Sequence, residues 1–100
     1  MQLSPAEAEF LRSQRIGRLA TVSSAGWPHV MPVMYSLRDD GGLEFDADGV
    51  KLRNITATGR AALVVDGMGP RRGVSVQGPC RVIGQERALL EPAHKFSWGL

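Results

Sequence analysis

The spacing of hydrophobic positions changes once near the start of the chain. Ala6, Phe10 and Leu11 recur at helical spacing, which predicts an amphipathic helix. From residue 15 onward the apolar residues follow the runs and alternations typical of strands, first over 15–22 and then over 29–37. A Ser-Ala-Gly-Trp-Pro segment separates the two runs, so the chain is predicted to turn there and to pair the two strands.

Capping residues indicate where the first helix begins and ends. Ser4 supplies a hydroxyl at the N-cap, Pro5 suits the first helical position, and Glu7 completes a capping box. Gly17 limits how far the helix can extend. We therefore expect the helix to run from Pro5 to about Gln14.

The middle of the chain continues with a turn, a strand and a second helix. The Arg-Asp-Asp-Gly-Gly segment at 38–42 predicts a tight turn, because Asp and Gly tolerate positive φ values. A short strand is expected over 43–46. Val50, Asn54 and Ile55 then recur on one side at helical spacing and Gly59 suits a C-cap, which predicts a short helix near residues 50–59.

The remainder of the chain is predicted to form strands. Hydrophobic runs at 61–66 and 73–83 flank a Gly-, Pro- and Arg-rich loop over 67–72, and a final short strand is expected within 89–100. Gly78 and Pro79 interrupt the longer run and predict a bulge or a sheet edge. About six short strands with two small helices predict a mainly β (α+β) fold, an antiparallel split β-barrel with Greek-key-like connections.

The run from 29 to 37 is apolar on both of its faces. The two alternating sets are His29, Met31, Val33, Tyr35 and Leu37 on one face, and Val30, Pro32, Met34 and Ser36 on the other. Antiparallel sheets commonly leave one face in water, so something must cover the second apolar face. Two small helices can cover only part of it, and a second copy of the chain is the simplest remaining cover. The pattern therefore predicts a homodimer.

Length and composition exclude several classes of protein. The 100 residues suit a single domain over 1–100, and 43% hydrophobic with 22% charged residues is an ordinary globular balance. No run reaches the roughly 18 apolar residues of a membrane span, and Glu7 and Glu9 stand where a signal peptide needs positive charge. The net charge is only +2 and no basic tail is present. We therefore expect a cytoplasmic protein that binds neither membranes nor nucleic acid.

Catalysis by side chains alone is poorly supported. The single cysteine, Cys80, has only His29 and His94 as candidate bases, and such a cysteine is more typical of a buried apolar position. Asp39 and Asp40 are explained by their turn, and no group of Cys, His and acidic residues has the spacing of a metal site. If the protein is an enzyme, a bound cofactor must supply the chemistry.

Ten of the twelve basic residues are arginine, which fits anion binding, but a GC-rich genome that encodes arginine often is the better explanation for the set as a whole. Lys51 is the sharper candidate for an anion site. It stands at the start of the second predicted helix, where an ammonium beside free backbone amides suits a phosphate, although a solvated surface lysine would give the same pattern. Arg53, and Arg71 and Arg72 in the loop over 67–72, are weaker candidates of the same kind.

Six segments occur in an order that resembles one protein family. They are Phe-Leu-Arg-Ser-Gln-Arg-Ile-Gly-Arg-Leu-Ala-Thr-Val at 10–22, Gly-Trp-Pro-His-Val-Met-Pro-Val at 26–33, Lys-Leu-Arg-Asn-Ile at 51–55, Ala-Ala-Leu-Val-Val-Asp at 61–66, Arg-Gly-Val-Ser-Val-Gln-Gly at 72–78 and Ser-Trp-Gly-Leu at 97–100. Together they resemble the flavin- or deazaflavin-binding split β-barrel family that includes pyridoxamine 5′-phosphate oxidase, and more narrowly its actinobacterial branch of coenzyme F420-dependent enzymes. No single segment is decisive, but together they span nearly the whole chain.

This resemblance implies a homodimer with two cofactor sites at the subunit interface, each built from both chains. Lys51 matches the family's phosphate-binding lysine, with Arg53 and Asn54 beside it as weaker candidates. The strands that line the cofactor ring and its ribityl chain match Leu19, Ala20, Thr21, Met31, Pro32 and Val33. Trp98 matches a C-terminal aromatic residue near the site, which would contact the ring from the other subunit or pack in the core.

The resemblance also implies a reaction. A hydride would move between the cofactor ring and an unsaturated or quinone-like small molecule, with no side chain needed as a general acid or base. Reduced deazaflavin (F420) is the expected cofactor and FMN the alternative. The acidic tail of the deazaflavin would need an extra cation, which Arg71 and Arg72 could supply.

Two departures from the family leave alternatives open. Family members usually have a helical stretch between the strand that ends near Ile83 and the last strand, and only residues 84–89 stand there in this chain. Asp46 and Asp48 precede Lys51, and carboxylates oppose a phosphate unless they point away. The second hypothesis is therefore that the protein binds a flavin, F420 or haem without catalysis. The third hypothesis is a dimer that binds no cofactor.

Overall fold

The structure, a computed structural model, describes residues 2–100 as two helices and seven strands. The helices are α1 (Pro5–Ser13) and α2 (Gly49–Thr58). The strands are β1 (Ile16–Val22), β2 (Pro28–Leu37), β3 (Leu43–Asp46), β4 (Arg60–Asp66), β5 (Gly73–Gly84), β6 (Arg87–Leu90) and β7 (His94–Trp98).

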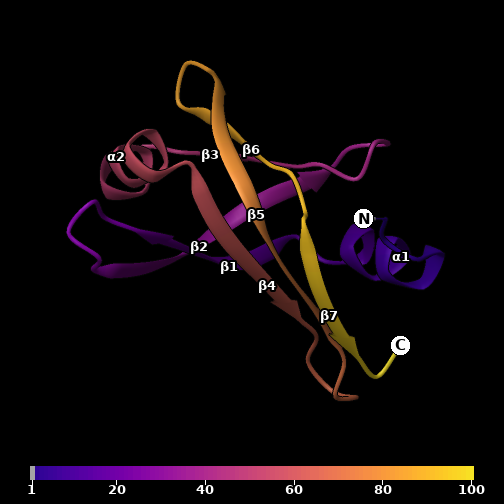
Figure 1. Cartoon of the computed structure of the whole chain (residues 1–100). Helices are drawn as coiled ribbons and strands as arrows, with labels where there is room; N and C mark the ends of the chain where they lie inside the picture. Colours follow the sequence, from indigo (N-terminus) through magenta and orange to yellow (C-terminus); the bar gives the residue numbers. More distant parts are fainter. Residues whose placement is uncertain (1) are drawn as a thin grey trace.

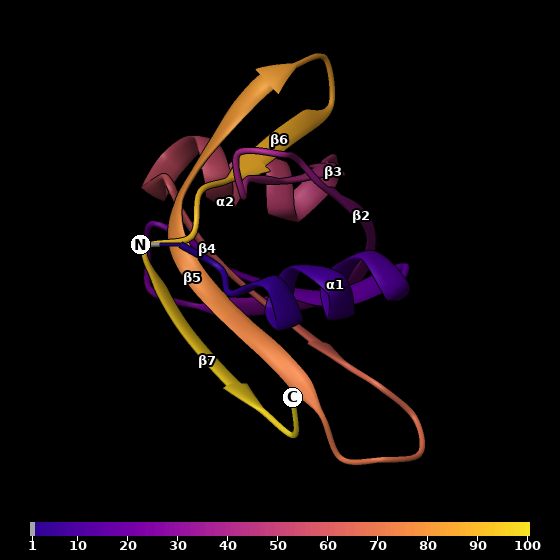
Figure 2. The same cartoon turned by 90° about the vertical axis from the view of Figure 1, so that its right-hand side faces the viewer.

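Six of the strands close into a barrel (Figure 1 and Figure 2). Hydrogen-bonded neighbours follow the order β4-β1-β2-β3-β6-β5, and β5 pairs in turn with β4. β7 lies beside β5 outside this ring, and every pair is antiparallel. The predicted fold class, an antiparallel split β-barrel with an N-terminal helix and a short second helix, is therefore confirmed.

β5 is the strand at which the barrel splits. Residues 73–77 of β5 pair with β7, and residues 80–84 pair with β6 along the same edge. Between them the backbone N–H groups of Glu91 and Ala93 donate to the carbonyl oxygens of Pro79 and Gln77, at 2.9 Å each. A Cβ at Gly78 would collide with the carbonyl oxygen of Glu91, so this close approach requires glycine.

The structure corrects two predictions for this half of the chain. No bulge lies at Gly78 and Pro79, because the pairing of β5 with β4 runs through them without a register shift, and the irregularity lies between Val82 and Gly84 instead. On the other side of β5 these two residues fall between the pairings with β7 and β6, in agreement with the sheet-edge alternative. Residues 84–89, for which no strand was predicted, contribute most of β6, which follows a tight turn in which Glu86 has a φ of 53°. The local pattern missed β6 because its pairing partners, β3 and β5, are supplied by the barrel.

α1 begins with the predicted capping box. Ser4 N donates to Glu7 Oε1 at 2.7 Å, and Glu7 N donates to Ser4 Oγ at 3.1 Å. The helix ends at Ser13, one residue before the predicted limit. Phe10 and Leu11 are buried as predicted, but Ala6 is exposed and Glu7 lies on the buried side in its place. The apolar pattern could not reveal this, because the partners of Glu7 come from the other end of the chain.

α2 ends at the predicted C-cap, where Gly59 has a φ of +68° and its N–H donates to Ile55 O at 2.9 Å. Asn54 and Ile55 are buried, as their spacing predicts. Val50, expected on the same side, is 38% exposed. α2 therefore packs on the barrel through its later turns, and its first turn is left more open.

The core of the barrel draws apolar side chains from both helices and from β1 to β6. Its largest fully buried members include Phe45, Leu11, Leu19, Leu43, Ile55 and Leu63. Tyr35 joins α1 to β2 because its hydroxyl donates to Leu11 O at 2.6 Å, and burial raises the pKa of this phenol to about 12. Across residues 2–100 neither helix is long and apolar enough to span a membrane.

One broad face of the sheet remains uncovered in the single chain. Strands β2, β1, β4, β5 and β7 lie side by side, and we call the side of these strands that points away from the core the outer face. Opposed residues such as Val30, Ala20 and Ala62 share it. Its large apolar members Ile16, Val30, Met34 and Phe96 are 53–68% exposed. The second apolar face predicted for β2 is part of this surface.

Candidate site at the start of α2

Lys51 lies in the first turn of α2, where no side chain caps the backbone. The N-cap residue is Asp48, and its carboxylate makes no hydrogen bond to the N–H groups of the helix. The Lys51 side chain is only 15% exposed, which is low for a lysine. Its ammonium therefore adds to the partial positive charge of an uncapped helix start, an arrangement suited to a phosphate.

The two acidic residues before Lys51 point in different directions. Asp48 Oδ1 accepts a hydrogen bond from Lys51 Nζ at 3.0 Å and so neutralises the ammonium. Asp46 instead faces β6, where its carboxylate accepts from Arg87 Nη1 at 3.0 Å. Of the two carboxylates expected to oppose a phosphate, only Asp48 is placed to do so. Its side chain is 70% exposed, which leaves it room to turn into solvent.

Arg53 and Asn54 have different surroundings although they are adjacent. Asn54 is 5% exposed, and its Nδ2 donates to Thr21 Oγ1 at 3.1 Å. Thr21 is 3% exposed, so this pair joins α2 to β1 beneath the helix surface. Arg53 is exposed and makes no ion pair with residues 2–100. Arg53 is therefore available to a ligand, whereas the Asn54 amide already has a structural partner.

The strand residues predicted to line a cofactor divide between two faces. Leu19, Thr21 and Val33 point into the barrel and are buried. Met31 lies on the same face but is 42% exposed. Ala20 and Pro32 lie on the outer face. Side-chain contact with a ligand outside the barrel is therefore open to Ala20, Pro32 and Met31, and the buried residues could contribute only backbone groups.

Arg71, Arg72 and Trp98 come from elements at the opposite end of the molecule from α2 (Figure 1 and Figure 2). The Arg72 guanidinium lies over the Phe10 ring, 5.2 Å from its centroid. Trp98 covers Gly73, where a Cβ would collide with the indole, and stacks on Phe96 with 5.8 Å between ring centroids. Within one chain the structure does not bring these three residues to Lys51.

His29 is a polar residue of this region that the sequence analysis did not place in the site. It lies opposite Thr21 in the pairing of β1 with β2. Its Nδ1 is the one buried side-chain nitrogen or oxygen within residues 2–100 that has no hydrogen-bond partner. Such an atom costs about 1–3 kcal/mol, which makes His29 a candidate for contact with a ligand. The sequence could have placed His29 in the site, because the alternation along β2 puts its side chain on the same face as Met31 and Val33, which were predicted to line the cofactor.

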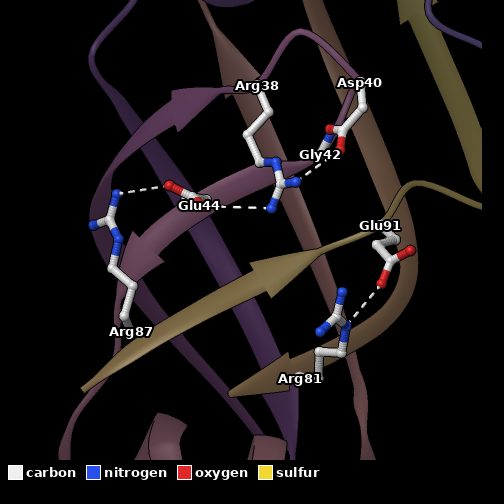
Figure 3. A network of polar contacts seen from close by, with 7 residues as sticks. All are labelled: Arg38, Asp40, Gly42, Glu44, Arg81, Arg87 and Glu91. Atoms are coloured by element: carbon white, nitrogen blue, oxygen red, sulfur yellow. Dashed lines mark hydrogen bonds and ion pairs between the residues drawn. The ribbon is translucent and has the colours of Figure 1, made fainter. Parts of the chain in front are cut away.

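The larger cavity lies elsewhere, between α1, the β2–β3 turn and the residues after β6. Its volume is about 570 Å³, and Arg12, Arg38 and Arg81 line it. Figure 3 shows Arg38 between Asp40, at 2.9 Å, and Glu44, at 3.5 Å. Arg81 Nε contacts Glu91 at 3.1 Å, and Arg12 lies 3.6 Å from Asp39. Each cation already has a carboxylate, and no residue predicted for the cofactor site lines this cavity.

A smaller cavity of about 350 Å³ lies where β7 begins. It is lined by Arg60, Gln77 and His94, together with the small residues Gly59, Ala61, Gly78, Pro79 and Ala93. No residue predicted for the cofactor site lines it either.

Catalysis by a cysteine or by a bound metal finds no support in this geometry. Cys80 is buried, and burial raises the pKa of its thiol to about 12, so the thiol stays protonated and unreactive near neutral pH. Over the described range 2–100, no three Cys, His or acidic side chains gather closely enough to hold a metal ion.

Comparison with known proteins identifies relatives of the whole chain. A reductase of Streptomyces rimosus, named 5a,11a-dehydrotetracycline/5a,11a-dehydrooxytetracycline reductase, is 30% identical over 121 aligned positions, which take in 100% of this chain and 85% of the relative. Since this chain has 100 residues, the relative carries at least 21 residues that are absent here.

Solved structures with the same fold include two with known ligands in their names. The FAD binding protein of Mycobacterium smegmatis superposes with a TM-score of 0.72 and 21% identity, over 95% of this chain and 93% of that one. HutZ, the haem storage protein of Vibrio cholerae, superposes with a TM-score of 0.76 and 14% identity, over 96% and 94%. At these identities the likeness concerns the fold alone.

A family profile described as pyridoxamine 5′-phosphate oxidase matches residues 3–97. This match covers nearly the whole chain, from α1 to β7, and it agrees with the order of motifs, with the split barrel and with the 30% identical relative. The chain therefore belongs to the pyridoxamine 5′-phosphate oxidase family.

Proposed function

We propose that this protein is an oxidoreductase that binds a flavin-type cofactor at the interface of a homodimer, with reduced F420 as the first candidate cofactor and FMN as the second. Its substrate would be an unsaturated or quinone-like small molecule. Support comes from the family, from the reductase activity named for the 30% identical relative and from the FAD binding named for a protein of the same fold.

The observation that carries this proposal is the environment of Lys51. Its ammonium is largely screened from solvent and adjoins the uncapped first turn of α2. This set of donors fits the phosphate that FMN and F420 share. Asp48 would have to turn away when the phosphate binds, and its high exposure makes that movement inexpensive.

The outer face supports the dimer. Ile16, Val30, Met34 and Phe96 expose apolar area on a sheet that no element of residues 2–100 covers. In a dimer with two-fold symmetry, opposite ends of the two chains can meet. The Arg71, Arg72 and Trp98 end of one chain would then lie near Lys51 of its partner, which would complete a site that the single chain leaves divided.

The cofactor would supply the hydride chemistry through its ring when bound. The residues of this chain would bind and orient it. Lys51 and Arg53 would neutralise the phosphate, while Ala20 and Pro32, which share the outer face, would give the ring an apolar surface that excludes water. No side chain would need to act as a general acid or base.

The direct test is a fluorescence titration with FMN and with F420. We expect Lys51→Ala to weaken binding by about 10–100-fold, the loss expected for one charge-assisted contact, and Lys51→Arg to retain most of the affinity. Arg15→Ala is the matched control, since Arg15 is exposed and makes no ion pair with residues 2–100. A folded protein that binds neither compound, or binds them equally well without Lys51, would contradict the proposal.

The choice between the two cofactors depends on Arg71 and Arg72. Replacing both with alanine should weaken binding of F420 much more than binding of FMN, because only F420 has an acidic tail. Equal losses for the two cofactors would remove these arginines from the proposed site.

The dimer can be tested separately by sedimentation. Met34→Glu places a charge on the apolar outer face, at a side chain that is 68% exposed in the single chain, so it should yield a folded monomer. Glu86→Gln, in the exposed turn between β5 and β6, is a control that should leave the assembly unchanged. A monomeric wild-type protein at micromolar concentration would argue against the shared site.

A non-catalytic binding protein is the second candidate. The observation that favours it lies within the aligned region, where at least 21 residues of the reductase relative have no counterpart in this chain. A protein named for haem storage also shares the fold. Adding haemin to the same titration separates the two, because tight haemin binding with no response to FMN or F420 would favour storage or delivery over turnover.

A further inference from the structure

The smaller cavity has the chemistry of an anion site that is separate from Lys51. Three strands meet at its walls: β4 contributes Arg60, β5 contributes Gln77 and β7 contributes His94. From these donors we propose that this cavity binds an oxyanion, a phosphate or a carboxylate group carried by a small molecule.

The pairing of the strands brings the three side chains together. Gln77 lies directly opposite His94 on β7. On its other side, Gln77 lies opposite Ala62, two residues from Arg60, which is itself opposite Pro79. Directly opposed and diagonal neighbours of a sheet share a face and lie within reach of long side chains. A guanidinium, an amide and an imidazole therefore face the same hollow from neighbouring strands, on the outer face and so beside or within the proposed dimer interface.

The charge around this cavity is unbalanced. No Asp or Glu side chain lines it, and Arg60 makes no ion pair with residues 2–100. The larger cavity is the useful contrast, because each of its three arginines has a carboxylate within 3.6 Å. An anion entering the larger cavity must displace a carboxylate, whereas one entering the smaller cavity meets an unpaired guanidinium.

Small residues create the space. Gly59, Ala61, Gly78 and Ala93 surround the three donors. Gly78 cannot be enlarged, because its Cβ would meet the backbone of residues 91–93 where β6 gives way to β7. The split of the barrel thus produces a hollow of about 350 Å³, within the size range of small-ligand sites.

The position of the smaller cavity in the fold also limits its affinity for an anion. Gly59 is the C-cap of α2, and the C-terminal end of a helix repels anions. The side chains must therefore supply all of the attraction. We expect binding in the millimolar range for a simple ion, with tighter binding for a molecule that fills more of the cavity.

The test uses the two histidines of the chain, His29 and His94, whose imidazole signals can be followed by NMR. Inorganic phosphate and acetate are titrated separately at constant ionic strength. The His94 signal should shift in a saturable manner, and His29, which does not line the cavity, reports separately on any binding outside it. Tighter binding of phosphate would identify a phosphate group as the ligand chemistry, and tighter binding of acetate a carboxylate.

Three variants decide the outcome. Arg60→Gln should weaken the His94 response by about tenfold, whereas Arg15→Gln, which removes an exposed cation outside the cavity, should not. Lys51→Ala should leave the response intact, so failure of the proposed cofactor site and failure of this site are distinguishable. A linear, non-saturating shift, an undiminished response in Arg60→Gln, or loss of the response in Lys51→Ala would each overturn the proposal.

Discussion

The two helices of this protein begin in opposite ways. At α1 the first turn is capped, because Ser4 and Glu7 bond to each other, and Glu7 also accepts hydrogen bonds from Lys95 Nζ at 2.7 Å and Ser97 Oγ at 2.6 Å. At α2 the N-cap residue Asp48 leaves the backbone N–H groups uncapped and turns to Lys51 instead. The first arrangement serves stability, and the second leaves donors free for a ligand.

The same contrast appears in burial. The Glu7 side chain is 7% exposed, so its ion pair with Lys95 lies in a medium that strengthens charge interactions. Asp48 is 70% exposed, and an ion pair of that kind is worth at most about 1 kcal/mol. Substitutions at the two helix starts should therefore separate stability from binding.

The largest effect is expected at α1. Glu7→Gln removes the charge that holds β7 against the helix, and it should lower the free energy of unfolding by about 2–3 kcal/mol, measured by urea denaturation. Glu9→Gln is the matched control on the exposed side of the same helix and should change it by less than about 0.5 kcal/mol. Equal effects of the two substitutions would mean that the buried hydrogen bonds and ion pair of Glu7 add nothing to the stability.

The pH dependence should show the same network. Burial by itself raises the pKa of Glu7. The hydrogen bonds from Lys95, Ser97 and Ser4 and the charge of Lys95 together lower it by a larger amount, so the pKa falls from 4.5 to about 2. The resulting stabilisation, roughly 3 kcal/mol, is complete above about pH 4.5 and is lost as the pH falls toward 2. Unfolding curves of wild type and Glu7→Gln should therefore converge between these pH values. A constant difference down to pH 2 would rule out Glu7 as its source.

A smaller effect is expected from a substitution at α2, where the affinity for a ligand should change rather than the stability. Asp48→Asn removes the carboxylate that neutralises Lys51, so it should raise the affinity for the phosphate of FMN or F420 by about tenfold. Asp46→Asn is the control, since that carboxylate is engaged with Arg87. Unchanged affinity in Asp48→Asn would show that the phosphate binds elsewhere.

The smallest effect on stability is expected from a substitution of Lys51, which contrasts with that of Glu7. Lys51→Ala should change the free energy of unfolding by less than about 0.5 kcal/mol, because it breaks only an ion pair with an exposed partner, even though it should abolish most cofactor binding. Urea denaturation of the variant without cofactor measures this directly. A loss as large as that of Glu7→Gln would make Lys51 a structural residue.

Elements defined by local signals were predicted closely. The capping box of Ser4 and Glu7, the turn at 38–42 and the Gly59 C-cap depend on residues within one turn of one another, so the sequence shows them directly. β6 and the bulge at Val82–Gly84 were not predicted, because a four-residue strand depends on the neighbours with which it pairs. Val50 and Ala6 were misplaced because spacing gives a side of the helix but not how far the barrel covers it.

The candidate site was predicted as a set of residues but not as an arrangement. The sequence placed Lys51 at a helix start, and the structure adds that Asp48 neutralises it and that Asn54 is already bonded to Thr21. The unpartnered Nδ1 of His29 appears only once β1 and β2 are paired. The separation of Arg71, Arg72 and Trp98 from Lys51 follows from the topology of the whole barrel, which no local motif encodes.

The sequence by itself determined the class of fold, the caps of α1, the family and the lysine at the start of α2, because alternation, capping and motif order are properties of neighbouring residues. Only the tertiary structure decided which charges meet. Glu7 and Lys95 are 88 residues apart in the chain yet form a close ion pair, while Arg60, beside a cavity, has no carboxylate partner among residues 2–100. Strand pairing sets such distances, and it depends on the free energy of the whole barrel rather than on any one segment.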